Sequence, residues 1–124
     1  MMFGRLCAPT ALLVLQACTA VPTADGQRLK MASPEFRAYV ERVFREQNRV
    51  ADEVAFALEA DGATRKNLVA AEQRLLEACA GVNELATTRR DEQRLGVRHR
   101  AAAARSVPAC EQATKTAAAM LEDS

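Results

Sequence analysis

The chain of 124 residues is poor in aromatic side chains, with no tryptophan, one tyrosine and four phenylalanines. It has a single histidine, His99, so a metal site built from several imidazoles is not expected. Glycine and proline are scarce after residue 34, and no segment shows the alternation of β-branched residues that indicates a strand. What remains is rich in alanine, leucine, glutamate, arginine and glutamine, which all favour helices. These absences predict one small all-α domain.

Long hydrophobic runs are also lacking. The longest, from Ala11 to Ala17, is too short to span a bilayer, which needs about 20 apolar residues. It follows one positive charge, Arg5, and no acidic residue precedes Asp25. A positive start, a short apolar centre and small residues at its end are typical of a secretory signal.

The end of this signal, Leu15-Gln16-Ala17-Cys18, resembles a bacterial lipobox, although Gln16 replaces the usual small residue. The resemblance implies cleavage before Cys18, a diacylglycerol on its sulfur and a third acyl chain (palmitate) on its new amino group. In a Gram-negative cell it also implies an outer-membrane lipoprotein facing the periplasm, because Thr19 follows the cysteine. Two alternatives are cleavage after Ala20, which would give a soluble periplasmic protein, and a cytosolic chain with an apolar start.

The cysteines are consistent with export. If the signal is removed with Cys7 and if Cys18 carries lipid, only Cys79 and Cys110 remain. An even number in an oxidising compartment predicts one disulfide between them. No CxxC pair indicates a redox site.

The chain therefore divides into a signal peptide at 1–17, a lipidated cysteine with a flexible tether at 18–33, and a helical bundle at 34–124. Residues 19–33 contain proline, glycine and threonine without a periodic apolar face, so we expect no regular structure there. The bundle should begin at Ser33, a good N-cap, with Pro34 at the first helical position and Glu35 in the first turn.

Within the bundle, residues at alternating spacings of four and three form three seams, the pattern of helices that pack against each other. The first seam runs through 34–60, the second through 64–91 and the third through 96–122. Pro108 should kink or divide the third helix. The seam residues are Phe36, Val40, Val43, Gln47, Val50, Val54 and Ala57; Leu68, Glu72, Leu75, Cys79, Val82 and Ala86; and Ala103, Val107, Cys110, Thr114, Ala117 and Leu121.

Pairing Cys79 with Cys110 in an antiparallel hairpin places the turn between residues 94 and 95, close to Gly96. That layout predicts a three-helix up-down-up bundle. In the alternative layout the second helix continues to Arg105 and a short third helix starts at Ser106, which would keep the two thiols far apart.

Function is expected to be binding and not catalysis. We call the arginines around the predicted turn the basic end; they are candidates for contact with anionic lipid headgroups, or else an ordinary solvated helix end. Phe56, an apolar ring on a charged helix face, is a candidate contact for an envelope protein or a second copy. The basic end consists of Arg89, Arg90, Arg94, Arg98 and Arg100.

No phosphate loop, HExxH motif or nucleophile elbow indicates an enzyme. We therefore predict a non-catalytic binding or structural module tethered to the cell envelope, or alternatively a soluble periplasmic binding or inhibitor protein. Neither a cofactor nor a small-molecule substrate is evident. Nucleic acid is not an expected partner, because no aromatic stacking residue accompanies the arginines.

Overall fold

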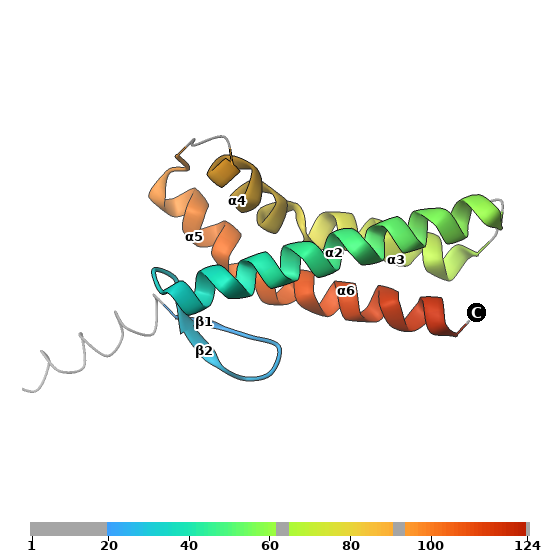
Figure 1. Ribbon diagram of the computed structural model, residues 1–124, viewed down its shortest axis with the longest axis horizontal. Helices are drawn as coiled ribbons and strands as arrows, with labels where there is room; N and C mark the ends of the chain where they lie inside the picture. Colours follow the sequence, from blue (N-terminus) through green and yellow to red (C-terminus); the bar gives the residue numbers. More distant parts are fainter. Residues whose placement is uncertain (1–19, 62–64, 91–93, 124) are drawn as a thin grey trace, which may run out of the picture.

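The computed structural model describes residues 20–61, 65–90 and 94–123, so Cys18 and the predicted signal peptide lie outside it. The described part is mostly helical with one small antiparallel sheet (Figure 1), which confirms the all-α expectation in its general form. The elements are β1 (Ala20–Pro22), β2 (Arg28–Lys30), α2 (Pro34–Ala60), α3 (Lys66–Ala78), α4 (Ala80–Arg90), α5 (Val97–Arg105) and α6 (Val107–Glu122).

Helix α2 begins where the capping residues predict. The Ser33 hydroxyl accepts a hydrogen bond from the Phe36 amide at 3.1 Å, and Pro34 and Glu35 occupy the first turn. The cap satisfies one of the amides that a helix start leaves unpaired. Helix α2 then runs for 27 residues, the longest element in the described part of the chain.

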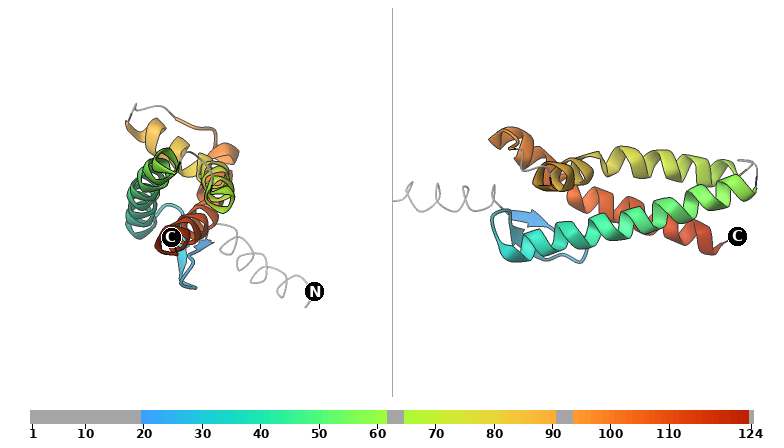
Figure 2. Two further views of the ribbon diagram at one scale, coloured as in Figure 1. Left: turned by 90° about the vertical axis from the view of Figure 1, so that its right-hand side faces the viewer. Right: turned by 45° about the horizontal axis from the view of Figure 1, so that its top comes forward.

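Helices α2, α3 and α6 lie side by side and enclose most of the core (Figures 1 and 2). Nearly all the predicted seam residues are buried there, while Tyr39 and Leu58 join them from the edge of the α2 seam. The core is built from valine, leucine and alanine, so burial of small side chains supplies most of its hydrophobic stabilisation.

The second and third predicted helices are each divided in two, so the described residues do not form three uninterrupted helices. The break at Cys79 separates α3 from α4, and the break at Ser106 separates α5 from α6. Pro108, which has no amide hydrogen, lies in the first turn of α6, so the division predicted at this proline is confirmed. The Ser106 hydroxyl donates to the Ala103 carbonyl at 2.6 Å and helps to end α5.

Two separate helices, α4 and α5, lie between Cys79 and Cys110, as opposed to one helix that runs on to Arg105. Helix α4 ends at Arg90 and α5 begins at Val97, so the second helix does not continue to Arg105. The sulfur atoms of Cys79 and Cys110 lie 2.07 Å apart, at disulfide distance, with 4.5 Å between their Cα atoms. We call α4 and α5 together the arm, because they leave the other helices at this bridge (Figure 1).

The prediction of a flexible tether is wrong for residues 20–30, which form a β-hairpin. Strand β1 pairs antiparallel with β2, with Val21 opposite Leu29, and Val21 is fully buried. The turn is held by the Thr23 amide, which donates to the Gln27 carbonyl at 2.7 Å, and by Gly26 at φ +87°, a conformation natural to glycine. Burial of one valine and the contacts of the turn order a segment whose three-residue strands are too short to show a period.

Among the described residues, none of the helices combines the length and the apolar character needed to cross a membrane.

Candidate functional site

A groove of about 940 Å³ lies between the first turns of α2 and the arm. The arm leans away from α2 at this end of the molecule, as Figures 1 and 2 show. The segment that joins β2 to α2 also lines it. We call this feature the arm groove; its lining residues are Met31, Ala32, Ser33, Phe36, Arg37, Val40, Glu41, Phe44, Arg45, Leu85, Ala86, Thr88, Arg89, Arg90, Val97, Arg100, Ala101 and Ala104.

The apolar lining of the arm groove comes from every element around it. Phe36, Val40 and Phe44 recur at four-residue spacing along α2, which places them on one face of that helix. Leu85 belongs to α4, and Val97, which is 87% exposed, belongs to α5. An 87% exposed valine beside a groove is apolar surface that a bound molecule would remove from water.

Five arginines line the same groove: Arg37, Arg45, Arg89, Arg90 and Arg100. Glu41 is the only acidic residue in the lining, and its carboxylate forms an ion pair with Arg89 at 3.1 Å, which joins α2 to α4. Within the described ranges, Arg37, Arg45 and Arg100 take part in no ion pair. The groove therefore combines apolar walls with excess positive charge, an arrangement suited to noncovalent binding of an anionic amphiphile.

The residues of the predicted basic end are all exposed, at the end of α4, on α5 and in the segment before it. Arg89, Arg90 and Arg100 line the arm groove, whereas Arg94 and Arg98 do not. His99 Nε2 lies 2.7 Å from Glu84 Oε1, a contact that joins α5 to α4 and is an ion pair when the histidine is protonated.

Two arginines of the groove, Arg37 and Arg45, were not among the predicted site residues. They come from the charged face of α2, more than 40 residues before the basic end in the sequence. Arg37 and Arg45 lie about two helical turns apart among other charged residues of α2, a pattern typical of an ordinary solvated helix face. Arg37 and Arg45 line the same groove as Arg100 because the arm diverges from α2, and no local sequence pattern predicts that divergence.

The other predicted contact, Phe56, is 75% exposed on α2. It does not line the arm groove. The lipidation candidate, Cys18, lies outside the described residues. In the part of the chain that the structure describes, no group of three or more histidine, cysteine, aspartate or glutamate side chains is placed to hold a metal ion.

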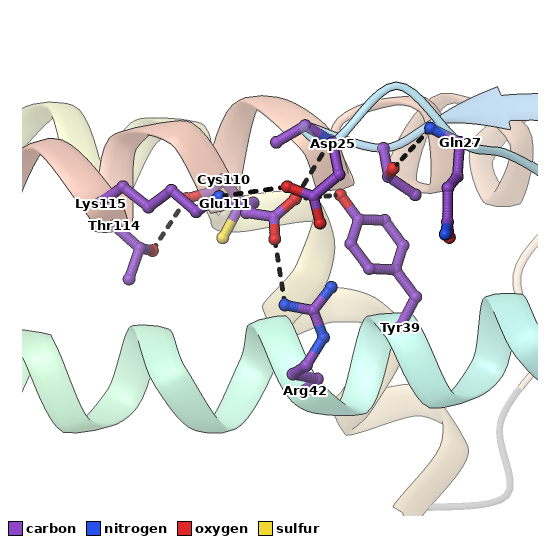
Figure 3. Close-up of polar contacts among 10 residues, drawn as sticks. Asp25, Gln27, Tyr39, Arg42, Cys110, Glu111, Thr114 and Lys115 are labelled. Atoms are coloured by element: carbon purple, nitrogen blue, oxygen red, sulfur yellow. Dashed lines mark hydrogen bonds and ion pairs between the residues drawn. The ribbon is translucent and has the colours of Figure 1, made fainter.

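A second polar cluster, centred on the carboxylate of Glu111, was not predicted at all (Figure 3). Glu111 in α6 is only 5% exposed and accepts three hydrogen bonds: from the Tyr39 hydroxyl at 2.7 Å, from the Arg42 guanidinium at 3.1 Å and from the Ala24 amide at 3.2 Å. The cluster thereby joins the β-hairpin, α2 and α6. Its one sequence signal is a position next to the seam residue Cys110.

Electrostatics keep this buried carboxylate ionised. Burial opposes the charge of Glu111, but the hydrogen bonds from Tyr39, Ala24 and Arg42, with the positive charge of Arg42, outweigh it and hold the pKa of Glu111 below its usual value. Burial and the bond to the Glu111 carboxylate raise the pKa of the Tyr39 hydroxyl, so Tyr39 stays a donor at all physiological pH values. The Arg42 guanidinium also lies 5.2 Å from the centre of the Tyr39 ring.

Comparison of the chain with protein-family models, with curated protein sequences and with solved structures finds no significant match.

Proposed function

We propose that this chain is an envelope lipoprotein, a non-catalytic binding or structural module held at a membrane by an acylated Cys18 and facing the periplasm. The lipobox-like residues Leu15 to Cys18 support export and acylation. The cysteine pair at disulfide distance supports an oxidising compartment, where such bridges persist. If the cell is Gram-negative, Thr19 favours the outer membrane.

One observation carries the proposal furthest: the described chain starts at the end of the molecule where the arginines of the basic end lie. Ala20, at the start of β1, is only two residues from Cys18, and β1, the first turn of α2 and the tip of the arm lie together at one end in Figure 1. A lipid on Cys18 would therefore bring Arg94 and Arg98 close to the headgroups. Each arginine near an anionic surface contributes about 1 kcal/mol to binding.

The finer architecture belongs to the same proposal. The chain acts as an up-down-up bundle of three helical segments, α2, α3 with α4, and α5 with α6, in which the last two segments are bent at the Cys79–Cys110 pair. The bend directs the arm away from α3 and α6 (Figure 1), and the arginines of the basic end are exposed there, so they can reach a flat surface without unfolding.

Vesicle binding tests the headgroup contact. The chain from Thr19 onward, which has no acyl group, is mixed with vesicles of phosphatidylglycerol and phosphatidylcholine, and separately with phosphatidylcholine alone. We expect binding only to the anionic vesicles, and a loss of roughly 10- to 30-fold in the Arg94→Gln/Arg98→Gln variant. The matched control is Lys66→Gln/Arg74→Gln, which removes the same charge from exposed positions of α3. Equal losses in the two variants would refute a surface contact by the basic end.

Intact mass tests the anchor independently. Protein extracted from its native membranes should begin at Cys18 and carry three acyl chains. It should also gain about 2 Da when the one cystine takes up two hydrogens on reduction. An unacylated chain that washes off the membrane would replace this proposal with the alternative of a soluble periplasmic binding protein.

A further inference from the structure

The arm groove combines the volume of a small-molecule site with a lining that is both apolar and positively charged. Its volume of about 940 Å³ lies within the range of small-molecule sites, roughly 300–1,000 Å³. Phe36, Val40 and Phe44 mark its course along α2, and at 1.5 Å per residue they span about 12 Å. That length matches an extended alkyl chain of roughly ten carbons at about 1.3 Å each.

The charge of the lining selects the ligand's head group. Because Glu41 is already paired with Arg89, the acidic group of the groove is occupied, whereas Arg37, Arg45 and Arg100 make no ion pair in the described parts of the chain. A carboxylate or phosphate beside Arg45 and Arg100 would gain charge-assisted hydrogen bonds, while Arg37, about two helical turns away, adds to the positive charge of the groove. A cationic head group would be repelled.

We propose that the arm groove binds a single-chain amphiphile with an anionic head group, for which a fatty acid of about ten to twelve carbons is the simplest probe. The alkyl chain lies along α2 between the half-buried Phe44 and the exposed Val97, over the largely buried side chains of Phe36 and Val40, and the head group meets Arg45 and Arg100. This inference goes beyond the proposed envelope function and does not depend on acylation of Cys18.

A helix from a partner protein fits the groove less well. A helix confined to a 12 Å span would have about eight residues, and isolated helices of that length are marginal in water. A longer helix would have to lie mostly outside the groove. An alkyl chain needs no such extension.

Calorimetric titration tests the proposal on the full-length chain carrying Cys18→Ala, so that no acyl group of its own competes. Octanoate, decanoate and dodecanoate are added below the concentrations at which they form micelles. One molecule should bind per chain, and each added methylene should tighten the dissociation constant by roughly two- to fourfold, because a buried methylene contributes up to about a factor of four. Decyltrimethylammonium, with the same chain and a cationic head, should bind at least about tenfold more weakly than decanoate.

Two variants, the first with a matched control, locate the site. Val97→Asp adds a negative charge at an exposed position of the lip and should weaken decanoate binding about tenfold or more, whereas Leu76→Asp, the same kind of change at an exposed position of α3 outside the groove, should not. Arg45→Gln/Arg100→Gln should reduce the affinity for decanoate but bring it close to that for decyltrimethylammonium. Circular dichroism confirms that each variant keeps its helix content.

Three results would overturn the inference. The first is no decanoate binding at millimolar concentration, and the second is equal weakening by Val97→Asp and Leu76→Asp. The third is an acidic amphipathic peptide that binds one to one, loses affinity with Val97→Asp and is not displaced by decanoate; it would assign the groove to a partner helix. Loss of vesicle binding in Arg94→Gln/Arg98→Gln with unchanged decanoate binding would leave both proposals standing, because those arginines do not line the groove.

Discussion

Replacing Glu111 by alanine should release the β-hairpin from the helices. The carboxylate accepts two hydrogen bonds on one oxygen, from the Tyr39 hydroxyl and the Ala24 amide, and one from Arg42 on the other. Hydrogen bonds to a charged acceptor contribute about 1.5–3 kcal/mol each when buried. The donors that are left without an acceptor add a desolvation penalty. The Arg42 side chain is 59% exposed, so its bond adds less than about 1 kcal/mol. We expect Glu111→Ala to lower the free energy of unfolding by about 3–4 kcal/mol.

Glu111→Gln separates the charge from the hydrogen bonds. The amide oxygen can still accept from Tyr39 and Ala24, so this variant should lose only about 1–2 kcal/mol. Urea unfolding followed by circular dichroism, with the cystine intact at pH 7, measures both losses. Glu122→Ala, an exposed position at the end of the same helix, should change the free energy of unfolding by less than about 0.5 kcal/mol.

The pH dependence gives the sign of the charge effect. Because the pKa of Glu111 in the folded state lies below its usual value of 4.5, its ionised form stabilises the folded protein fully above that pH. This contribution disappears as the pH falls through the folded-state pKa. The difference in stability between the native chain and Glu111→Gln should therefore be constant near neutral pH and shrink below pH 4.5.

Amide hydrogen exchange supplies the local readout, because the Ala24 amide should exchange much faster in Glu111→Ala while amides in the middle of α2 change only through global unfolding. A loss of less than about 1 kcal/mol, with protection of the Ala24 amide retained, would refute the view that Glu111 holds the hairpin in place.

Three further changes test the packing around the bridge and the seams. Reduction of the Cys79–Cys110 cystine should lower the free energy of unfolding by about 3–4 kcal/mol, because the bridge restricts the unfolded chain. Identical urea unfolding curves in the presence and absence of reductant would contradict this. Gly81→Ala should destabilise the protein by about 1 kcal/mol although alanine favours helices, because the added Cβ would clash with the Ser106 hydroxyl. Adding Ser106→Ala should restore part of the loss, and a stabilised single variant would show that Gly81 and the end of α5 are not in close contact. Gln47→Met should leave stability unchanged or raise it by about 1 kcal/mol in thermal melts, because the buried Gln47 Oε1 has no hydrogen-bond partner among the described residues.

Repeating patterns made the helices predictable. Ser33 and Pro34 located the start of α2, and the seam spacing located its buried face, because a helix repeats its environment every three or four residues. Pro108 marked a break because its chemistry acts on its own turn. That the helix ending at Arg90 does not continue to Arg105 was predictable from the cysteine pair, because this pair is the one long-range constraint visible in the sequence.

The rest depended on contacts between distant residues. The hairpin at 20–30 is held by one buried valine and by Glu111, which lies 87 residues after its partner Ala24. No sequence feature near residue 24 predicts that Glu111 is its partner. The arm groove likewise needs Arg45 and Arg100 to face one space, and that depends on the angle at which the arm leaves the core. Sequence patterns predict which face of an element is apolar but not how far two elements diverge.

The Cys79–Cys110 bridge also makes the arm a closed ring of chain, since α4 and α5 lie wholly between the two cysteines. If a protease cuts one peptide bond anywhere in that ring, both fragments remain joined through sulfur. The buried Val82 and Ala104 of the arm would therefore stay tethered to the core even after a cut. A nick in the arm would release no fragment until the bridge is reduced, so proteolysis there would be visible only on a reducing gel.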